Sequence, residues 1–194
     1  GVLAADFMVK SGSLILGLTI GLAVGLLVGL FNGYVTAWLK VPSFITTLGV
    51  LVMARGLARE VTSGNTVGDL PTLFTDFMSA KVFGLQVPVY IAIAYGLIFH
   101  VILKRTKFGL HVVSIGGNAE AARRSGISVE RVLLGVFALS GLSIAVSGIT
   151  LLGRVRAGQP NASTLLELYA VAAVILGGTR LTGGKGSIMQ TTAG

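Results

Sequence analysis

A run of 29 residues, Ser11 to Leu39, contains no charged side chain and is bracketed by Lys10 and Lys40. About 20 helical residues cross the ~30 Å hydrocarbon layer of a membrane, so this run is long enough to span it. Val82 to Leu103 and Val132 to Gly153 also lack Asp, Glu, Lys and Arg and are also long enough. Because backbone polar groups in lipid must pair within their own segment, these runs predict an all-α integral membrane protein, a polytopic helical bundle.

Glycines recur every four residues along the first run. They are Gly17, Gly21, Gly25, Gly29 and Gly33. This spacing places them on one stripe of a helix, where a neighbouring helix can approach backbone to backbone, so we expect a helix-packing face. A pore-lining stripe of exposed carbonyl groups is the alternative.

Composition excludes several classes of protein. With 53% hydrophobic and 11% charged residues, the chain lies far from the ~25% charged residues of soluble domains. The net charge of +8 does not indicate nucleic acid binding, because six of the fifteen Lys and Arg residues lie in one segment, Lys104 to Arg131, and report membrane topology. There is no cysteine, the two histidines are eleven residues apart, and no nucleophile or phosphate-loop pattern fits. We therefore expect no catalytic centre, metal site or cofactor.

Two further apolar segments are less regular. Phe44 to Val61 follows a break at Pro42 and carries Arg55, Arg59 and Glu60 near its far end, so it is either a tilted span or a re-entrant half-helix. Thr62 to Gln86 contains glycines, Pro71 and two aspartates, and we expect an irregular loop with one surface helix.

Thr164 to Leu176 is too short to cross comfortably, and the glycines after it, from Gly177 to Gly186, break the chain. This pattern is typical of a discontinuous helix beside a substrate route. Glu167 is the one acid within this segment, and it either serves function or lies at the outer interface and pairs with Arg154 or Arg156.

Five residues are candidates for a substrate path. They are Asn32, Phe44, Thr46, Thr47 and Glu167. For Asn32, Thr46 and Thr47 the alternative to binding a polar solute is hydrogen bonding between helices.

The segment Lys104 to Arg131 holds the clearest functional signal. Asn118 can cap a short helix, Glu120 lies in its first turn, Arg123 and Arg124 in its last, and Gly126 can supply a left-handed stop. Ala119 to Ser125 is far shorter than the ~12 to 15 residues at which an isolated helix is even marginally stable. The helix offers alanines instead of the Trp, Phe or Leu that a membrane surface requires, so we expect it to be held by a soluble partner protein.

If Phe44 to Val61 crosses the membrane, nine Lys and Arg residues lie on one side of it. They are Lys40, the six of Lys104 to Arg131, Arg180 and Lys185. Four lie on the other side and two in the helix end. The positive-inside rule then places Lys104 to Arg131 in the cytoplasm.

The stretch Gly116-Gly117-Asn118-Ala119-Glu120-Ala121-Ala122-Arg123-Arg124-Ser125-Gly126-Ile127 resembles the cytoplasmic coupling segment of bacterial sugar-type ABC permeases of the ribose and xylose branch. Asn32-Gly33, Pro42 to Gly49, and Ala172 to Thr179 before Gly183-Gly184-Lys185-Gly186 agree with the same family, in order along nearly the whole chain. Two departures, Tyr169 after Leu166-Glu167-Leu168 and Arg180 in place of a small residue, prevent the assignment of one sugar.

The resemblance implies a multi-pass protein of the bacterial inner membrane, surrounded by lipid. Its implied partners are two ATP-binding cassette ATPase subunits, a second permease subunit as homo- or heterodimer, and a periplasmic sugar-binding protein. It assigns ATPase coupling to eight residues of the segment. They are Gly117, Asn118, Glu120, Ala121, Ala122, Arg123, Gly126 and Ile127.

Residues 1–194 are then a single, incomplete transmembrane permease domain that lacks N-terminal and C-terminal helices, within a ten-helix whole. We predict a transport subunit and not an enzyme, which couples ATP hydrolysis by a partner to monosaccharide import. The alternatives are a stand-alone channel or secondary transporter, which would depend on intramembrane charges such as Glu167, and an integral-membrane enzyme, for which the acids are too scattered.

Overall fold

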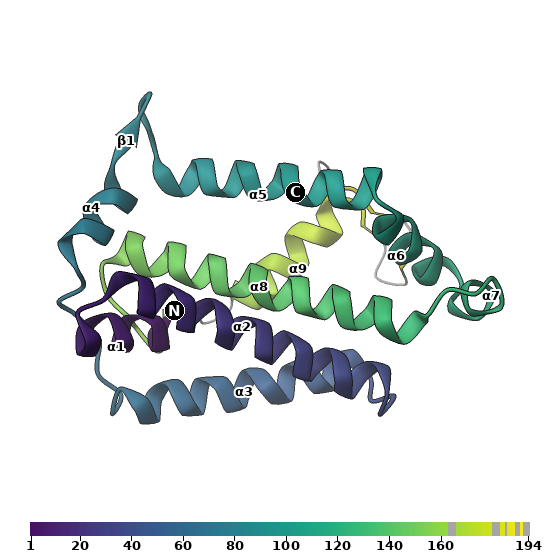
Figure 1. Cartoon of the computed structure of the whole chain (residues 1–194), viewed down its shortest axis with the longest axis horizontal. Coiled ribbons are helices and arrows are strands. Elements are labelled where there is room, and N and C mark those ends of the chain that lie inside the picture. Colours follow the sequence, from purple (N-terminus) through teal and green to yellow (C-terminus); the bar gives the residue numbers. More distant parts are fainter. Residues whose placement is uncertain (163–165, 180–182, 185, 189–190, 192–194) are drawn as a thin grey trace. The chain divides into compact units, whose positions relative to one another are not determined.

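The computed structural model describes residues 1–162, 166–179, 183–184, 186–188 and 191, and nearly all regular structure in that part of the chain is helical (Figure 1). The elements are α1 (Val2–Ser11), α2 (Leu14–Ala37), α3 (Ser43–Val61), α4 (Thr72–Ser79), β1 (Lys81–Val82), β2 (Leu85–Gln86), α5 (Val87–Arg105), α6 (Lys107–Gly117), α7 (Ala119–Arg124), α8 (Val129–Val155) and α9 (Leu166–Leu176).

The chain divides into two units, which are described separately. The first comprises residues 1–90 and 134–162, and holds α1 to α4, the hairpin and most of α8. The second comprises residues 91–133 and 163–194, and holds most of α5 together with α6, α7 and α9.

The first long helix begins later than the charge-free run predicts. Gly12 adopts φ +64°, a left-handed conformation that ends α1 at Ser11. Ser13 then caps α2, and its hydroxyl oxygen accepts a hydrogen bond from the Leu16 amide at 3.4 Å. The predicted span from Ser11 is therefore wrong at its start, because hydropathy does not register a left-handed glycine followed by a cap.

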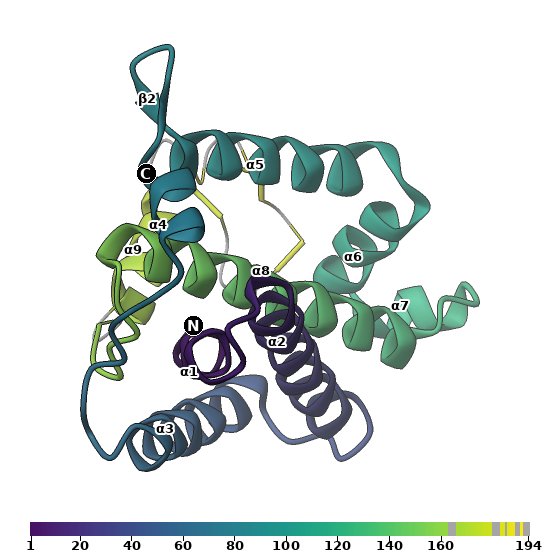
Figure 2. The same ribbon diagram turned by 60° about the vertical axis from the view of Figure 1, so that its left-hand side comes forward.

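The glycine stripe of α2 faces two other helices of the first unit, α1 and α8. A Cβ at Gly21 would lie 3.0 Å from the Ala4 Cβ of α1 and 3.4 Å from Ile149 Cδ1 of α8. A Cβ at Gly33, twelve residues on, would lie 3.1 Å from Leu134 Cδ1. Helices α2 and α8 therefore run antiparallel and in close contact, as Figures 1 and 2 show.

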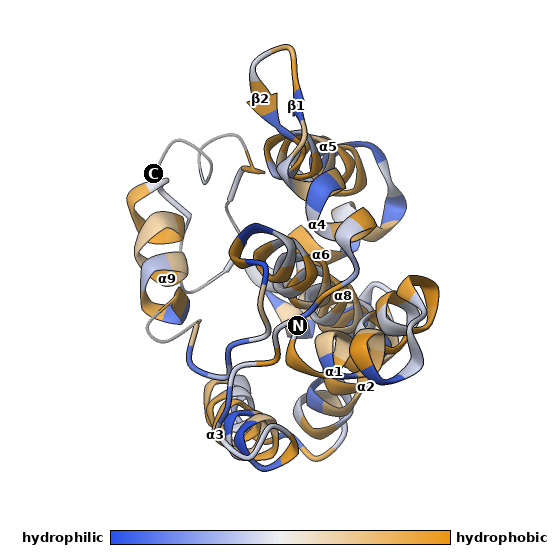
Figure 3. Ribbon diagram, turned by 90° about the vertical axis from the view of Figure 1, so that its left-hand side faces the viewer, coloured by the Kyte–Doolittle hydropathy of each residue, from blue (hydrophilic) through white to orange (hydrophobic). Residues whose placement is uncertain are grey.

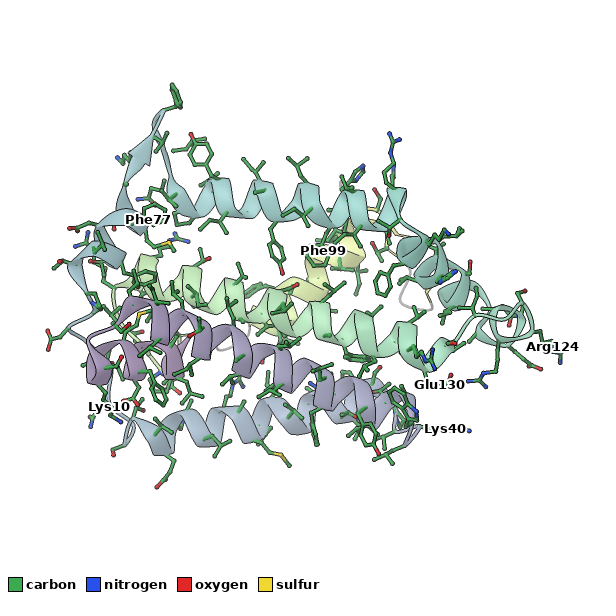
Figure 4. All side chains as sticks on the ribbon, viewed as in Figure 1. Lys10, Lys40, Phe77, Phe99, Arg124 and Glu130 are labelled. Carbon is green, nitrogen blue, oxygen red and sulfur yellow. The ribbon has the colours of Figure 1, made fainter. Side chains whose placement is uncertain are left out.

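Helix α3 extends from one end of this pair to the other. It begins a few residues after α2 ends, near Lys40, which lies at the opposite end of α2 from Lys10 (Figure 4). At the other end of α3, Arg59 donates through Nη2 to Asn161 Oδ1 at 3.0 Å, and Asn161 follows the end of α8. Nineteen helical residues span about 28 Å. Helix α3 is therefore long enough for a full span, although it is less apolar than α2, α5 and α8.

The region between α3 and α5 contains a short helix and a hairpin. Helix α4 packs against the end of α8, where a Cβ at Gly153 would lie 2.8 Å from Met78 Cβ. Val82 pairs with Leu85 across a two-residue turn, in which Phe83 and Gly84 have φ +48° and +82°. The predicted span from Val82 is therefore wrong at its start, because residues 82–86 belong to the hairpin, which begins at Lys81, and α5 begins at Val87.

Three of the described helices, α2, α5 and α8, are long and apolar enough to cross a membrane. Many of their large apolar side chains are exposed, for example Ile15 at 73% and Leu97 at 58%. Figure 3 shows hydrophobic residues along both α2 and α5. Apolar surface of this extent is typical of helices that face lipid or other membrane helices. The predicted helical membrane fold is confirmed.

Candidate functional site

The segment between α5 and α8 is more ordered than the sequence predicts. A helix not expected there, α6, begins directly after α5, and Thr106 separates the two helices with an extended backbone. The Thr106 side chain caps α6 by accepting a hydrogen bond from the Gly109 amide at 3.1 Å. Gly109 lies so close to the Leu103 carbonyl that a side chain would collide with it. The turn from α5 into α6 therefore depends on a cap and a glycine.

The signals predicted at the two ends of α7 are both present, a cap at its start and a left-handed glycine after its end. Asn118 Oδ1 accepts a hydrogen bond from the Ala121 amide at 2.9 Å, which confirms the predicted N-cap. Gly126 has φ +82°, which confirms the predicted left-handed stop. The Gly126 amide donates to the Arg123 carbonyl at 3.0 Å, and the Ile127 amide to the Ala122 carbonyl at 3.1 Å. These two bonds form a Schellman motif, which satisfies the last carbonyl groups of the helix.

Two ion pairs hold the charged side chains of α7. Arg124 Nη2 lies 2.5 Å from Glu120 Oε1, one helical turn away, and both side chains are exposed. Arg123 pairs with Glu130 in the first turn of α8. Figure 4 labels Arg124 at the tip of the segment and Glu130 where α8 begins. Glu130 was not predicted as a site residue, although an acid in the first turn of a long helix is a recognisable signal.

The outer surface of α7 is free of the rest of the described chain. Ala122 is buried at 5% exposure, whereas Asn118, Glu120 and Ala121 are exposed. Beside α7, an open hollow of about 420 Å³ lies between α6 and the start of α8. Its lining residues are Phe108, His111, Ser125, Gly126, Ile127, Ser128, Arg131 and Val132. The segment therefore offers a small exposed helix next to a partly cationic hollow.

The residues predicted for a substrate path do not all lie in one unit. Asn32, Phe44, Thr46 and Thr47 belong to the first unit and Glu167, in the first turn of α9, to the second. The Asn32 side chain is buried, and its Oδ1 forms no hydrogen bond with any described residue. Thr36 Oγ1, one helical turn further along α2, shares this condition. Buried polar atoms normally have partners, so both oxygens are available to a donor.

The hydroxyl groups of α3 are already engaged. Thr46 Oγ1 donates to the Pro42 carbonyl at 3.4 Å and Thr47 Oγ1 to the Ser43 carbonyl at 2.9 Å. Phe44 is 72% exposed. Arg156, one of two residues considered as partners of Glu167, donates to Ser79 Oγ at 3.1 Å. Among the described residues no group of three or more His, Cys, Asp or Glu side chains is arranged to hold a metal ion.

The fold and the site define a class: a multi-pass helical membrane protein with a short, doubly capped helix between two of its membrane helices. The whole chain, residues 1–194, matches the family described as branched-chain amino acid transport system / permease component, and the protein belongs to that family. Helices that can cross a membrane and this membership make it a multi-pass protein of the bacterial inner membrane.

Several curated proteins are similar along the whole chain. The L-arabinose transport system permease protein AraH of Escherichia coli K12 is 43% identical over 194 residues, which are 100% of this chain and 59% of that protein. The ribose import permease proteins RbsC of Bacillus subtilis and Haemophilus influenzae are 41% and 35% identical and are covered to 60% and 61% of their lengths. This chain therefore spans about three fifths of the length of these relatives. No solved structure is significantly similar to it. The resemblance to sugar-type permeases is confirmed.

Proposed function

We propose that the protein is the membrane-spanning permease subunit of an ATP-driven importer for a monosaccharide, a pentose or a hexose. The observation that carries this proposal is the match to permeases named for arabinose and ribose, which extends over the entire chain. Residues 1–194 then belong to one permease domain that continues in the rest of the protein. The subunit provides the path for the sugar, and ATP hydrolysis takes place in a partner.

The proposed partners are two ATP-binding cassette ATPase subunits, a second permease subunit and a periplasmic sugar-binding protein. The charge distribution supports a cytoplasmic position for α6 and α7. Lys40 lies in the connection between α2 and α3, and α3 returns to the other end of α2. Arg180 and Lys185, which also entered the charge argument, lie outside the described residues. On that side of the membrane the only proposed partner is the ATPase.

We assign ATPase coupling to α7 and its flanks. A helix with exposed Glu120 and Ala121, a buried Ala122 and a fixed stop at Gly126 can enter a groove and be displaced as a unit. The hollow beside α7, which Ile127 and Arg131 help to line, can receive a side chain of the ATPase. Displacement of α7 by closure of the ATPase would then move the membrane helices.

We assign the substrate path to Asn32, Phe44, Thr46, Thr47 and Glu167. The buried and unpaired Asn32 Oδ1 supports this assignment, since a sugar hydroxyl is a suitable donor. The hydroxyl groups of Thr46 and Thr47 donate to their own helix, so their oxygens can still accept a bond from a solute. Phe44 offers an exposed ring on the same turn of α3.

The test uses the full-length permease, assembled with its ATPase in proteoliposomes. Gly126→Val places a β-branched residue at φ +82° and removes the stop of α7, and Glu120→Lys reverses the exposed charge. We expect both variants to reach the membrane normally and to lower sugar uptake per ATP hydrolysed at least about fivefold. Gly96→Ala in α5, where a Cβ would meet nothing within 4 Å, is the control.

Unchanged uptake by both variants would contradict the coupling role of α7. Sugar transport by the purified permease in liposomes without any ATPase would contradict the importer itself and favour a channel or secondary transporter. Co-purification of the permease with an ATPase subunit from solubilised membranes is a simpler first measurement.

A further inference from the structure

Two pairs of glycines in the second unit touch through their backbones. Gly116 and Gly117 end α6, just before the Asn118 cap of α7, and they lie against Gly183 and Gly184. A Cβ at Gly116 would lie 2.5 Å from the Gly184 amide nitrogen, and a Cβ at Gly184 would lie 2.9 Å from Gly117 Cα. Distances this short do not occur for real Cβ atoms, so both sides of this glycine contact require glycine.

The two sides require glycine for different reasons. Gly183 and Gly184 have φ +85° and +77°, so a side chain there would strain the backbone as well as collide. Gly116 is helical, and alanine there would ordinarily favour the helix. Gly116 therefore isolates the effect of the contact from the effect of backbone conformation.

The glycine contact is connected to the end of α9. Gly178 ends that helix with φ +77°, and its amide donates to the Ile175 carbonyl at 2.9 Å. The next residue, Thr179, lies against Gly186, where a Cβ would be 3.0 Å from Thr179 Cγ2. Thr179 Oγ1 also forms a hydrogen bond of 3.3 Å with Thr191 Oγ1. Contacts of described residues thus join the start of α7 to Gly184 and the end of α9 to Gly186, two residues further along the chain.

We propose that the glycine contact is a positioning element, which transmits displacement of α7 to α9 and thereby to Glu167. Backbone atoms in direct contact have no rotamers with which to absorb a displacement, and packed interiors compress little, so a shift at Asn118 moves Gly184 as well. This proposal rests on the proposed function, because it explains how movement of the docked helix reaches a residue of the substrate path.

Gly116→Ala in the full-length permease, assembled with its ATPase in proteoliposomes, tests the proposal. The added methyl group separates the two backbones without altering α7, so we expect the ATPase to bind and hydrolyse ATP as in the wild type. Uptake per ATP hydrolysed should fall at least about fivefold. The matched control is again Gly96→Ala, a helical glycine of the same unit with open space around it. Equal uptake per ATP in the two variants would overturn the proposal.

A second variant serves if Gly116→Ala does not accumulate in the membrane. Thr179→Ser keeps the hydroxyl that bonds Thr191 but removes the methyl group that lies against Gly186. We expect a lower uptake per ATP with normal ATPase binding, and wild-type coupling in Thr179→Ser would refute the transmission from the glycine contact to α9. Failure of the proposed function would differ, because the wild-type protein itself would then neither bind an ATPase nor import sugar.

Discussion

Helices α2 and α8 are predicted to tolerate no side chain larger than hydrogen at Gly25. A Cβ there would lie 2.5 Å from Ala145 Cβ and 2.7 Å from the Gly141 carbonyl oxygen. Carbon atoms in contact prefer about 3.5 Å or more, so Gly25→Ala forces the helices apart by about 1 Å. A gap of that size loses up to about half of the dispersion energy at the contact, and overpacking of this kind costs about 1 to 3 kcal/mol.

The matched control is Gly49→Ala in α3, where a Cβ would meet nothing within 4 Å. Both substitutions gain about 1 kcal/mol or less in helix propensity, so that gain cancels when the two variants are compared. The difference in their free energies of unfolding should therefore equal the overpacking cost, about 1 to 3 kcal/mol, with Gly25→Ala the less stable. The measurement is unfolding of the full-length protein in mixed micelles by titration with dodecyl sulfate, followed by circular dichroism.

A compensating change sharpens this test. Ala145→Gly removes the methyl group that faces Gly25 and leaves the Gly141 carbonyl in place, so the double variant should recover part of the lost stability. Equal stability of Gly25→Ala and Gly49→Ala would refute the packing argument. Recovery that is no better than additive would show that Ala145 is not the group displaced.

Two predictions concern α7. Asn118→Ala should remove about 1 kcal/mol of helix stability and speed amide exchange over residues 119–124 about fivefold, whereas Asn118→Asp keeps an acceptor for the Ala121 amide. The exchange is measured by mass spectrometry of the full-length protein, and equal exchange in the two variants would exclude the cap. Arg123→Glu or Glu130→Arg alone should also speed that exchange, by a factor of up to about five since the ion pair is partly exposed. The double variant should restore the slow exchange, and no restoration would mean that the ion pair does not hold α7.

Local signals explain what the sequence could predict about the site. The Asn118 cap and the Gly126 stop each act within three residues along the chain or on one backbone angle, so residue type alone suggests them. Helix α6 was missed because Gly109, Gly116 and Gly117 lower its helix propensity. Two of these glycines are present for tertiary reasons, since Gly109 approaches the end of α5 and Gly116 approaches Gly184.

Contacts between distant segments account for most of the rest. Hydropathy located α2, α5 and α8, because an apolar run of sufficient length has few other solutions in a membrane. It could not place the hairpin at Val82, because Val82, Phe83 and Leu85 are as apolar as the residues of the following helix. Gly84 was the available signal. The ion pair from Arg123 to Glu130 joins two helices, and no local pattern pairs that arginine with that acid.

The structure also changes what a partner must contribute to α7. Its short length suggests a helix that is ordered only when gripped, yet the Asn118 cap, the Gly126 stop and the buried Ala122 order it within its own chain. Fixing the backbone of one residue costs about 1 to 2 kcal/mol of conformational entropy. If a partner had to fold the six residues of α7, this cost would offset much of the free energy of binding. A preformed α7 leaves that energy for displacement of the helix. Under the proposed function, closure of the ATPase can therefore displace the membrane helices, because α7, the helix it binds, does not unfold first.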